Sequence, residues 1–112
     1  MRYDRMIDAF AKEPKARLGG ATYTWVYKSC QQFDYLFSHI DQLKTPFILF
    51  SAENEEIVYP YAHQKFVTAA KNLGKDCMAY EVENAQHELL IEKDEQRIET
   101  INETLNFYSR YD

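Results

Sequence analysis

Apolar residues follow two patterns along the chain, and their order predicts its architecture. Steps of three or four residues, typical of one face of a helix, occur at 2–11, 26–40, 61–73 and 94–108. Two short runs, "PFILFSAE" and "CMAYEVEN", lack that spacing and are typical of strands. The order after residue 46 is strand, helix, strand, helix. This order predicts an α/β unit with two parallel strands and a right-handed crossover.

Turn and capping residues set the expected bounds of the helices. The pair Gly19–Gly20 breaks the chain, and Thr22 is placed to cap the helix that follows. Gly74 is expected to end the third helix, and Asp94 to serve as the N-cap of the last one. Acidic residues Glu88 and Glu92 should favour the start of that helix through its dipole.

The apolar spacing also predicts which side of each helix is buried. The expected inward residues are Val26, Cys30, Phe33, Phe37 and Ile40 in the second helix, Phe66, Ala69, Ala70 and Leu73 in the third, and Ile98, Ile101, Leu105 and Tyr108 in the last. Cys30 and Cys77 are expected to be small buried side chains rather than a disulfide.

Composition narrows the class of protein. The chain has 112 residues, enough for one domain, and is 46% hydrophobic and 15% aromatic, so it does not have the composition of a disordered protein. A net charge of −5 argues against nucleic acid as a ligand. Two parallel strands make an incomplete sheet, however. We therefore expect a fragment that self-associates through its open sheet edge.

The sequence shows no sign of a membrane span, a signal peptide or a metal site. The longest purely apolar run, "FILF", is too short to cross a bilayer, and "MRYDRMIDAF" is charged throughout. The segment "HELLIE" would need a second histidine where Ile91 stands to match a zinc motif. No metal or other cofactor is expected.

Candidate chemistry collects where the two strands end. Glu53, Glu55 and Glu56 follow the first strand, and His87 follows the second. Parallel neighbouring strands aim these two loops at the same edge of the sheet, where α/β proteins usually place their sites. A carboxylate bonded to an imidazole fixes its tautomer and stabilises its cation, so the spacing favours an acid–base pair.

The order of acid loop, histidine loop and closing helix resembles a known family. The segments "RLGGATYTW", "TPFILFSAENEEIV" and "NAQHELLIEKD" are similar to the end of the lid, the acid loop and the histidine loop of bacterial lysophospholipases of the monoacylglycerol-lipase-like α/β-hydrolase family. The resemblance implies the C-terminal fragment of an α/β-hydrolase fold. Residues 1–44 would belong to the lid or cap, and 45–112 to the core.

The resemblance also implies roles for individual residues. Glu55 falls on the triad acid, although the family usually has Asp there and Glu53 is an alternative. His87 falls on the general base, and Tyr23 and Trp25 fall near the acyl-binding region, as substrate-binding candidates. A further departure is Ala52, where the family commonly has Gly.

One part of the family pattern is missing from this sequence. The nucleophile motif Gly-x-Ser-x-Gly does not occur, and none of Ser29, Ser38, Ser51 and Ser109 has that context. We therefore expect the last part of a longer serine hydrolase, inactive alone, whose full form acts on lipid esters such as lysophospholipids or monoacylglycerols. Its expected location is the bacterial cytoplasm or, peripherally, the inner membrane. The alternative is a truncated, non-catalytic module for binding or dimerisation.

Overall fold

The computed structural model describes the backbone of residues 2–111 and the side chains of residues 4–111. The chain forms two compact units, Met1–Gln42 and Leu43–Asp112, and each is described here by itself. Over the described residues, the elements are mixed α/β, with four α-helices and one two-stranded parallel sheet.

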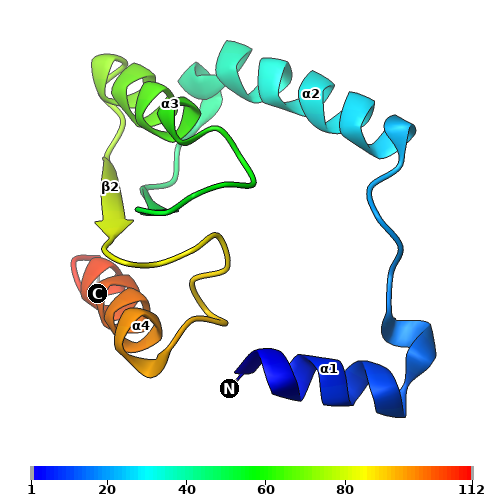
Figure 1. Ribbon diagram of the computed structural model, residues 1–112. Helices are drawn as coiled ribbons and strands as arrows, with labels where there is room; N and C mark the ends of the chain where they lie inside the picture. The colour runs from blue at the N-terminus through cyan, green and yellow to red at the C-terminus, as the bar shows by residue number, and fades with distance from the viewer. Residues whose placement is uncertain (1, 112) are drawn as a thin grey trace. The chain divides into compact units, whose positions relative to one another are not determined.

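The regular elements of the first unit, over its described residues, are helices joined by loops (Figure 1). It contains α1 (Arg2–Lys12), α2 (Tyr23–Ser38) and two short 3₁₀ helices, η1 (Pro14–Ala16) and η2 (Ile40–Gln42). The predicted cap of α2 is confirmed, because the Thr22 hydroxyl accepts a hydrogen bond from the Trp25 amide at 3.1 Å. The helix starts at Tyr23, three residues before the apolar pattern does.

The predicted burial of α2 is wrong for most of its apolar face. No residue of the helix is buried; Val26 and Phe33 are about half exposed, and Cys30 is exposed as well. Ile40, just beyond the helix, is the buried member of the set. Periodicity therefore identified an apolar stripe, of which Val26, Cys30 and Phe33 are exposed and Ile40 is buried.

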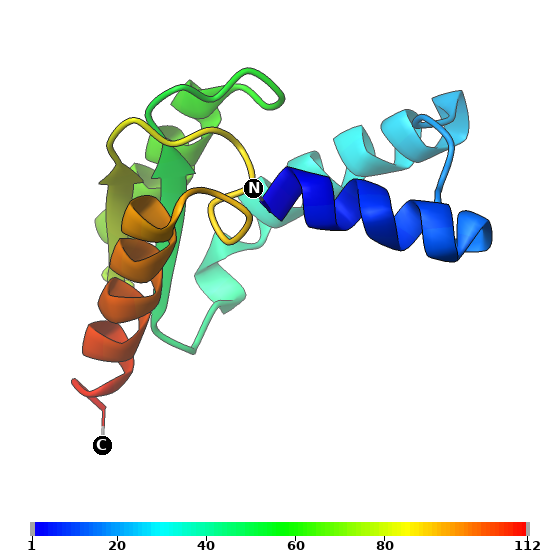
Figure 2. The ribbon, with the colours of Figure 1, turned by 60° about the horizontal axis from the view of Figure 1, so that its bottom comes forward.

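The second unit has the predicted strand–helix–strand–helix order. It consists of β1 (Phe47–Ala52), α3 (Pro60–Asn72), β2 (Cys77–Val82) and α4 (Asp94–Tyr108). The strands are parallel, with register running from Phe47 opposite Cys77 to Ala52 opposite Val82. Figures 1 and 2 show α3 and α4 on opposite faces of this sheet. Cys77 is buried, as predicted.

Helix α3 ends as its sequence predicts. Gly74 adopts a left-handed conformation with φ of 71°, and its amide donates to the Lys71 carbonyl at 2.9 Å. The Lys75 amide closes the cap by donating to Ala70 at 3.0 Å. Leu73, predicted to point inward, is instead exposed at the C-cap position, just after the last helical residue.

The buried side of α4 is the opposite of the predicted one. Its buried residues are Gln96, Thr100 and Phe107, whereas the predicted inward residues Ile98, Ile101, Leu105 and Tyr108 are all exposed. With about 3.6 residues per turn, these two sets lie on opposite sides of the helix. The Thr100 hydroxyl donates to the Gln96 carbonyl at 2.8 Å, so this threonine is buried with its donor satisfied.

The start of α4 also differs from the prediction. Lys93 occupies the N-cap position, and Asp94 is the first helical residue rather than the cap. The Asp94 carboxylate instead accepts a hydrogen bond from the Arg97 guanidinium at 3.2 Å. A carboxylate in the first helical turn still interacts favourably with the helix dipole.

A cluster of buried residues in the second unit lies at the carboxyl ends of the strands. Ala52, Val82 and Ala85 are at most 2% exposed, and Phe50, Tyr80 and Leu89 pack against them. This cluster lies directly below the two loops that leave the sheet, and it gives them a rigid base. Among the helices that the structure describes, none has the length and apolar character needed to cross a bilayer.

Candidate active site

The loops after β1 and β2 pair with each other beyond the ends of the strands. Figure 2 shows both loops leaving the same end of the sheet. The Glu53 amide donates to the Val82 carbonyl at 3.1 Å, and the Asn54 amide donates to the Ala85 carbonyl at 3.0 Å. The strand pairing is thereby extended into the segments that carry the candidate residues.

Asn84 makes the sharp turn at the start of the histidine loop. Its φ of 54° lies in the left-handed region, which asparagine tolerates better than most residues other than glycine. The Asn84 amide donates to Oε2 of Glu53 at 2.7 Å, so Glu53 binds the loop backbone and not the imidazole.

Glu55 is the carboxylate that reaches His87. Its Oε2 lies 2.6 Å from Nδ1 of His87, and its Oε1 accepts hydrogen bonds from the amides of Ile57 at 2.7 Å and Val58 at 3.1 Å. The Glu55 side chain is 3% exposed and that of His87 is 35% exposed. A buried carboxylate therefore orients a histidine that solvent can reach.

The surroundings of Glu55 favour its ionised form. Burial acts to raise the pKa of this carboxyl group, but hydrogen bonds from His87, Ile57 and Val58, together with the charge of His87, outweigh it and lower the pKa below its ordinary value. With Glu55 ionised, Nδ1 of His87 is the donor in the 2.6 Å contact. Nε2 then carries the lone pair and is the nitrogen able to accept a proton.

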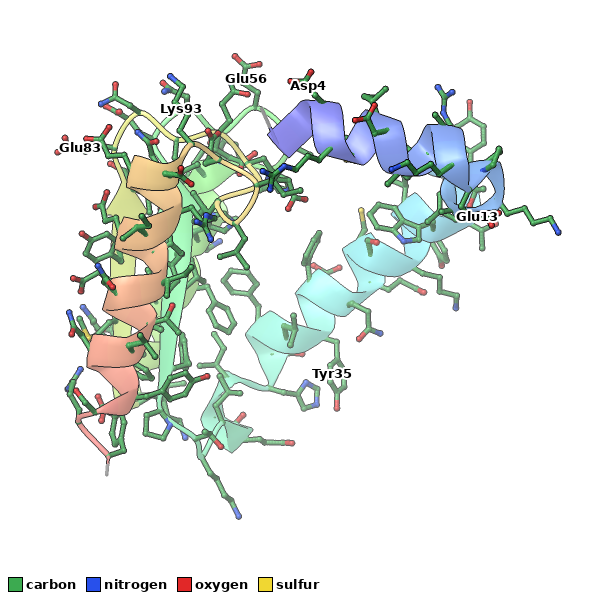
Figure 3. All side chains as sticks on the ribbon, turned by 90° about the horizontal axis from the view of Figure 1, so that it is seen from below. Asp4, Glu13, Tyr35, Glu56, Glu83 and Lys93 are labelled. Atoms are coloured by element: carbon green, nitrogen blue, oxygen red, sulfur yellow. The ribbon has the colours of Figure 1, made fainter. Side chains whose placement is uncertain are left out.

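The remaining predicted residues lie elsewhere. Glu56 is exposed and points away from the loop (Figure 3). Tyr23 and Trp25 are exposed residues of α2 in the first unit, so their substrate-binding role stays a prediction. Among the described residues, no group of three or more His, Cys, Asp and Glu side chains is arranged to hold a metal ion.

Glu92 has a different role in the structure from the one that the sequence predicts. The sequence predicts a helix-dipole role for Glu92, but its Oε1 accepts a hydrogen bond from the Gln86 amide at 2.8 Å. Its Oε2 lies 3.3 Å from the Lys93 amide, which donates to it. The sequence signal was an acidic side chain just before the helix, which does not distinguish a dipole effect from a bond to the preceding loop.

Comparison with known proteins gives a family and several relatives. A family model described as "Serine aminopeptidase, S33" matches residues 1–94. Lysophospholipase L2 of Escherichia coli (strain K12) is 31% identical over 113 residues, which cover 98% of this chain and 33% of the relative. Probable lysophospholipase L2 of Haemophilus influenzae is 31% identical over 101 residues, covering 88% of this chain and 31% of the relative.

These matches extend over nearly the whole chain but over a limited part of each relative. The chain spans about a third of the length of the curated relatives that it matches. No solved structure gives a significant match.

Proposed function

The chain belongs to the serine aminopeptidase S33 family of hydrolases, and on that premise we propose that it is the C-terminal part of a serine ester hydrolase acting on lysophospholipids or monoacylglycerols. The observation that carries the proposal is the 2.6 Å contact between the buried Glu55 carboxylate and Nδ1 of His87. The substrate class is proposed from the relatives, which are named lysophospholipase L2.

The proposed placement in the fold follows from the same pair. Residues 45–112 would form the C-terminal part of an α/β-hydrolase core, because they join two parallel strands whose ends carry an acid and then a histidine. Residues 1–44 would belong to the lid or cap. Tyr23 and Trp25, exposed on α2, would there contribute apolar surface for an acyl chain.

In the proposed mechanism His87 acts first as a base and then as an acid. Nε2 of His87 takes the proton of a serine hydroxyl while that serine oxygen bonds to the ester carbonyl carbon. Glu55 stabilises the imidazolium that forms. The imidazolium then protonates the leaving alcohol oxygen as its bond to the carbonyl carbon breaks, and this step leaves an acyl-serine. In the second half, Nε2 takes a proton from water, the water oxygen attacks the acyl carbon, and the serine leaves reprotonated.

The serine is proposed to come from a segment other than these 112 residues. The motif Gly-x-Ser-x-Gly is absent from the sequence, and the relatives are about three times as long as the chain. The 112 residues alone should therefore hydrolyse no ester, because a base without a nucleophile and oxyanion donors does not catalyse acyl transfer.

A chimera tests the proposal directly. In it, this chain replaces the matching third of the Escherichia coli relative, and hydrolysis of a lysophospholipid is measured. We expect activity in the chimera and a loss of about 10⁴-fold in kcat for both His87→Ala and Glu55→Gln. His39→Ala, at the end of α2, serves as the matched histidine control and should stay close to the parent activity.

Two outcomes would contradict the proposal. One is a chimera that is folded by circular dichroism but inactive. The other is a His87→Ala chimera that keeps its kcat within tenfold of the parent, because a general base cannot be removed at so small a cost.

A lipid substrate also implies a place of action. We propose that the complete protein works in the bacterial cytoplasm or peripherally at the inner membrane. Sedimentation of the chimera with anionic vesicles measures the membrane contact, and recovery of all protein in the supernatant at low salt would argue for the cytoplasmic alternative.

The second candidate function is a non-catalytic binding or dimerisation module. It is favoured by the two-stranded sheet, in which each strand pairs on one side only within the described residues, and by the exposed apolar side of α4. Light scattering on the 112-residue chain tests it. A stable dimer together with an inactive, folded chimera would favour the module, whereas a monomer would remove its dimerisation role.

A further inference from the structure

The turn that leads into His87 is held by two carboxylates from different parts of the chain. The Asn84 amide donates to Oε2 of Glu53 at 2.7 Å, and the Gln86 amide donates to Oε1 of Glu92 at 2.8 Å. Glu53 lies 31 residues before Asn84, and Glu92 lies 6 residues after Gln86. The amides of Asn84 and Gln86 thus both donate to carboxylates, and a charged acceptor makes a stronger hydrogen bond than a neutral one.

The residue between those two donors is fixed by packing. Ala85 is fully buried in the cluster with Ala52 and Val82, and its carbonyl accepts from the Asn54 amide at 3.0 Å. Residues 84–86 are therefore held by a carboxylate on each side and by the core in the middle. His87 follows directly, so the position of its backbone depends on these contacts.

The contact that depends on this arrangement is short. Nδ1 of His87 lies 2.6 Å from Glu55, and a shift of the loop by about 1 Å would take it out of good hydrogen-bonding range. The His87 side chain is 35% exposed, so surrounding side chains restrain it less than they restrain the buried Glu55. The bond to Glu55 orients the ring, and the backbone of the turn places the ring within reach of that bond.

We propose that Glu53 and Glu92 are positioning residues for His87. Each accepts a backbone N–H of the turn that carries the histidine, and together they hold Nδ1 against Glu55. Through these bonds Glu53 and Glu92 act on the backbone of the turn. The inference deepens the proposed function and rests on it, since it gives two further acidic residues a part in the same acid–base pair.

Matched variants separate positioning from simple charge removal. Glu53→Ala and Glu92→Ala remove the acceptor, whereas Glu53→Gln and Glu92→Gln remove the charge but keep a side-chain oxygen that can accept the same amide. Glu56→Ala is the control, because Glu56 lies in the same loop as Glu53 but is exposed and points outward (Figure 3).

The readout is the His87 Nδ1 proton in the nuclear magnetic resonance spectrum of the 112-residue chain. A proton shared with a carboxylate at this distance resonates far downfield and exchanges slowly with water. His87→Ala assigns the signal by removing it. We expect each alanine variant to speed exchange of this proton at least tenfold or to abolish the signal. Each glutamine variant and Glu56→Ala should keep it.

A variant with a shorter carboxylate side chain serves as a second test if an alanine variant does not fold. Glu53→Asp keeps the charge but withdraws the oxygens by one methylene group, so it should lose the Asn84 bond and speed exchange as alanine does. Unchanged exchange in folded alanine or aspartate variants would overturn the proposal, as would a wild-type chain without the signal, because there would then be no pair to position.

The same spectra distinguish this inference from the proposed function. Faster exchange in the variants, together with a folded and inactive chimera, would keep the positioning role and remove the hydrolase. An active chimera, together with variants whose Nδ1 proton exchanges at the wild-type rate, would keep the hydrolase and remove the positioning role.

Discussion

The loops at the strand ends differ from helices α2 and α4 in how far their key side chains are covered and hydrogen-bonded. In the loops, the buried Glu55 carboxylate accepts two backbone amides and contacts His87, and Ala85 is fully enclosed. In the helices, most of the apolar residues that the sequence marks for burial are exposed. The contacts that join Glu55, His87 and their loops thus lie within residues 47–93, whereas much of the apolar side of these helices is exposed.

The largest expected effect of substitution in the loops comes from the buried carboxylate. Glu55→Ala leaves the Ile57 and Val58 amides and the imidazole without an acceptor, so it should lower the free energy of unfolding by about 3 kcal/mol at neutral pH. Urea denaturation of the 112-residue chain measures this. A loss under about 1 kcal/mol would show that the contacts of Glu55 do not stabilise the loops more than an ordinary surface contact would.

The same residue should make stability depend on pH. The pKa of Glu55 is lowered in the folded chain, so the folded state favours the ionised carboxylate. Its contribution is complete above the ordinary glutamate pKa of 4.5 and is lost as pH falls through the lowered folded value. Glu55→Gln should therefore flatten the decline in stability below pH 4.5, and a parallel decline in both proteins would contradict the assignment.

The next effect concerns the packing below the loops. Val82 is fully buried, and Val82→Ala removes two methyl groups and leaves a cavity, so it should cost about 2 kcal/mol. Val58→Ala is the matched control, because Val58 is 37% exposed and should cost under about 0.5 kcal/mol. Equal losses in the two variants would remove the contrast between core and surface in this unit.

A smaller effect is expected where a helix does contain a satisfied polar contact. Thr22→Ala removes the hydroxyl that accepts the Trp25 amide, and it should destabilise α2 by about 1 kcal/mol. Thr22→Ser retains an acceptor and should recover most of that loss. Thermal melting followed by circular dichroism measures both, and identical melting of the alanine and serine variants would contradict the capping role.

The smallest effect is expected on the outer side of α4. Leu105→Ala changes a side chain that is 60% exposed, so it should alter the free energy of unfolding of a monomer by less than about 0.5 kcal/mol. Urea denaturation at several protein concentrations measures this. A loss above about 2 kcal/mol that grows with concentration would mean that a second copy covers this side, and the comparison would then need revision.

The sequence predicts the elements well because their signals are local. The order of helices and strands, the Thr22 cap and the Gly74 stop each depend on residues within one turn of the chain. The meeting of the acid and histidine loops was also predictable, since parallel neighbouring strands place both loops at one edge. Which acid would reach His87 remained open until the geometry placed Glu55 there and Glu53 on Asn84.

The sequence does not predict which side of a helix faces the sheet. Spacing places Ile98 and Leu105 on one side of α4 but does not say whether that side meets the sheet. Thr100 can be buried because its hydroxyl bonds within its own helix, so its polarity does not exclude the inner side. The error at Cys30 has the same origin, because apolar spacing marks a stripe and not its partner.

The parallel pairing of β1 and β2 has a consequence for the time course of folding. Phe47 pairs with Cys77, so forming the sheet closes a loop of 77 − 47 = 30 residues, at an entropic cost of about 3 kcal/mol before any contact repays it. Helix α3 can form early and shorten that search, because its hydrogen bonds are local. Glu55 and His87, on segments joined only through this crossover, should therefore meet late, after the strands have found their register.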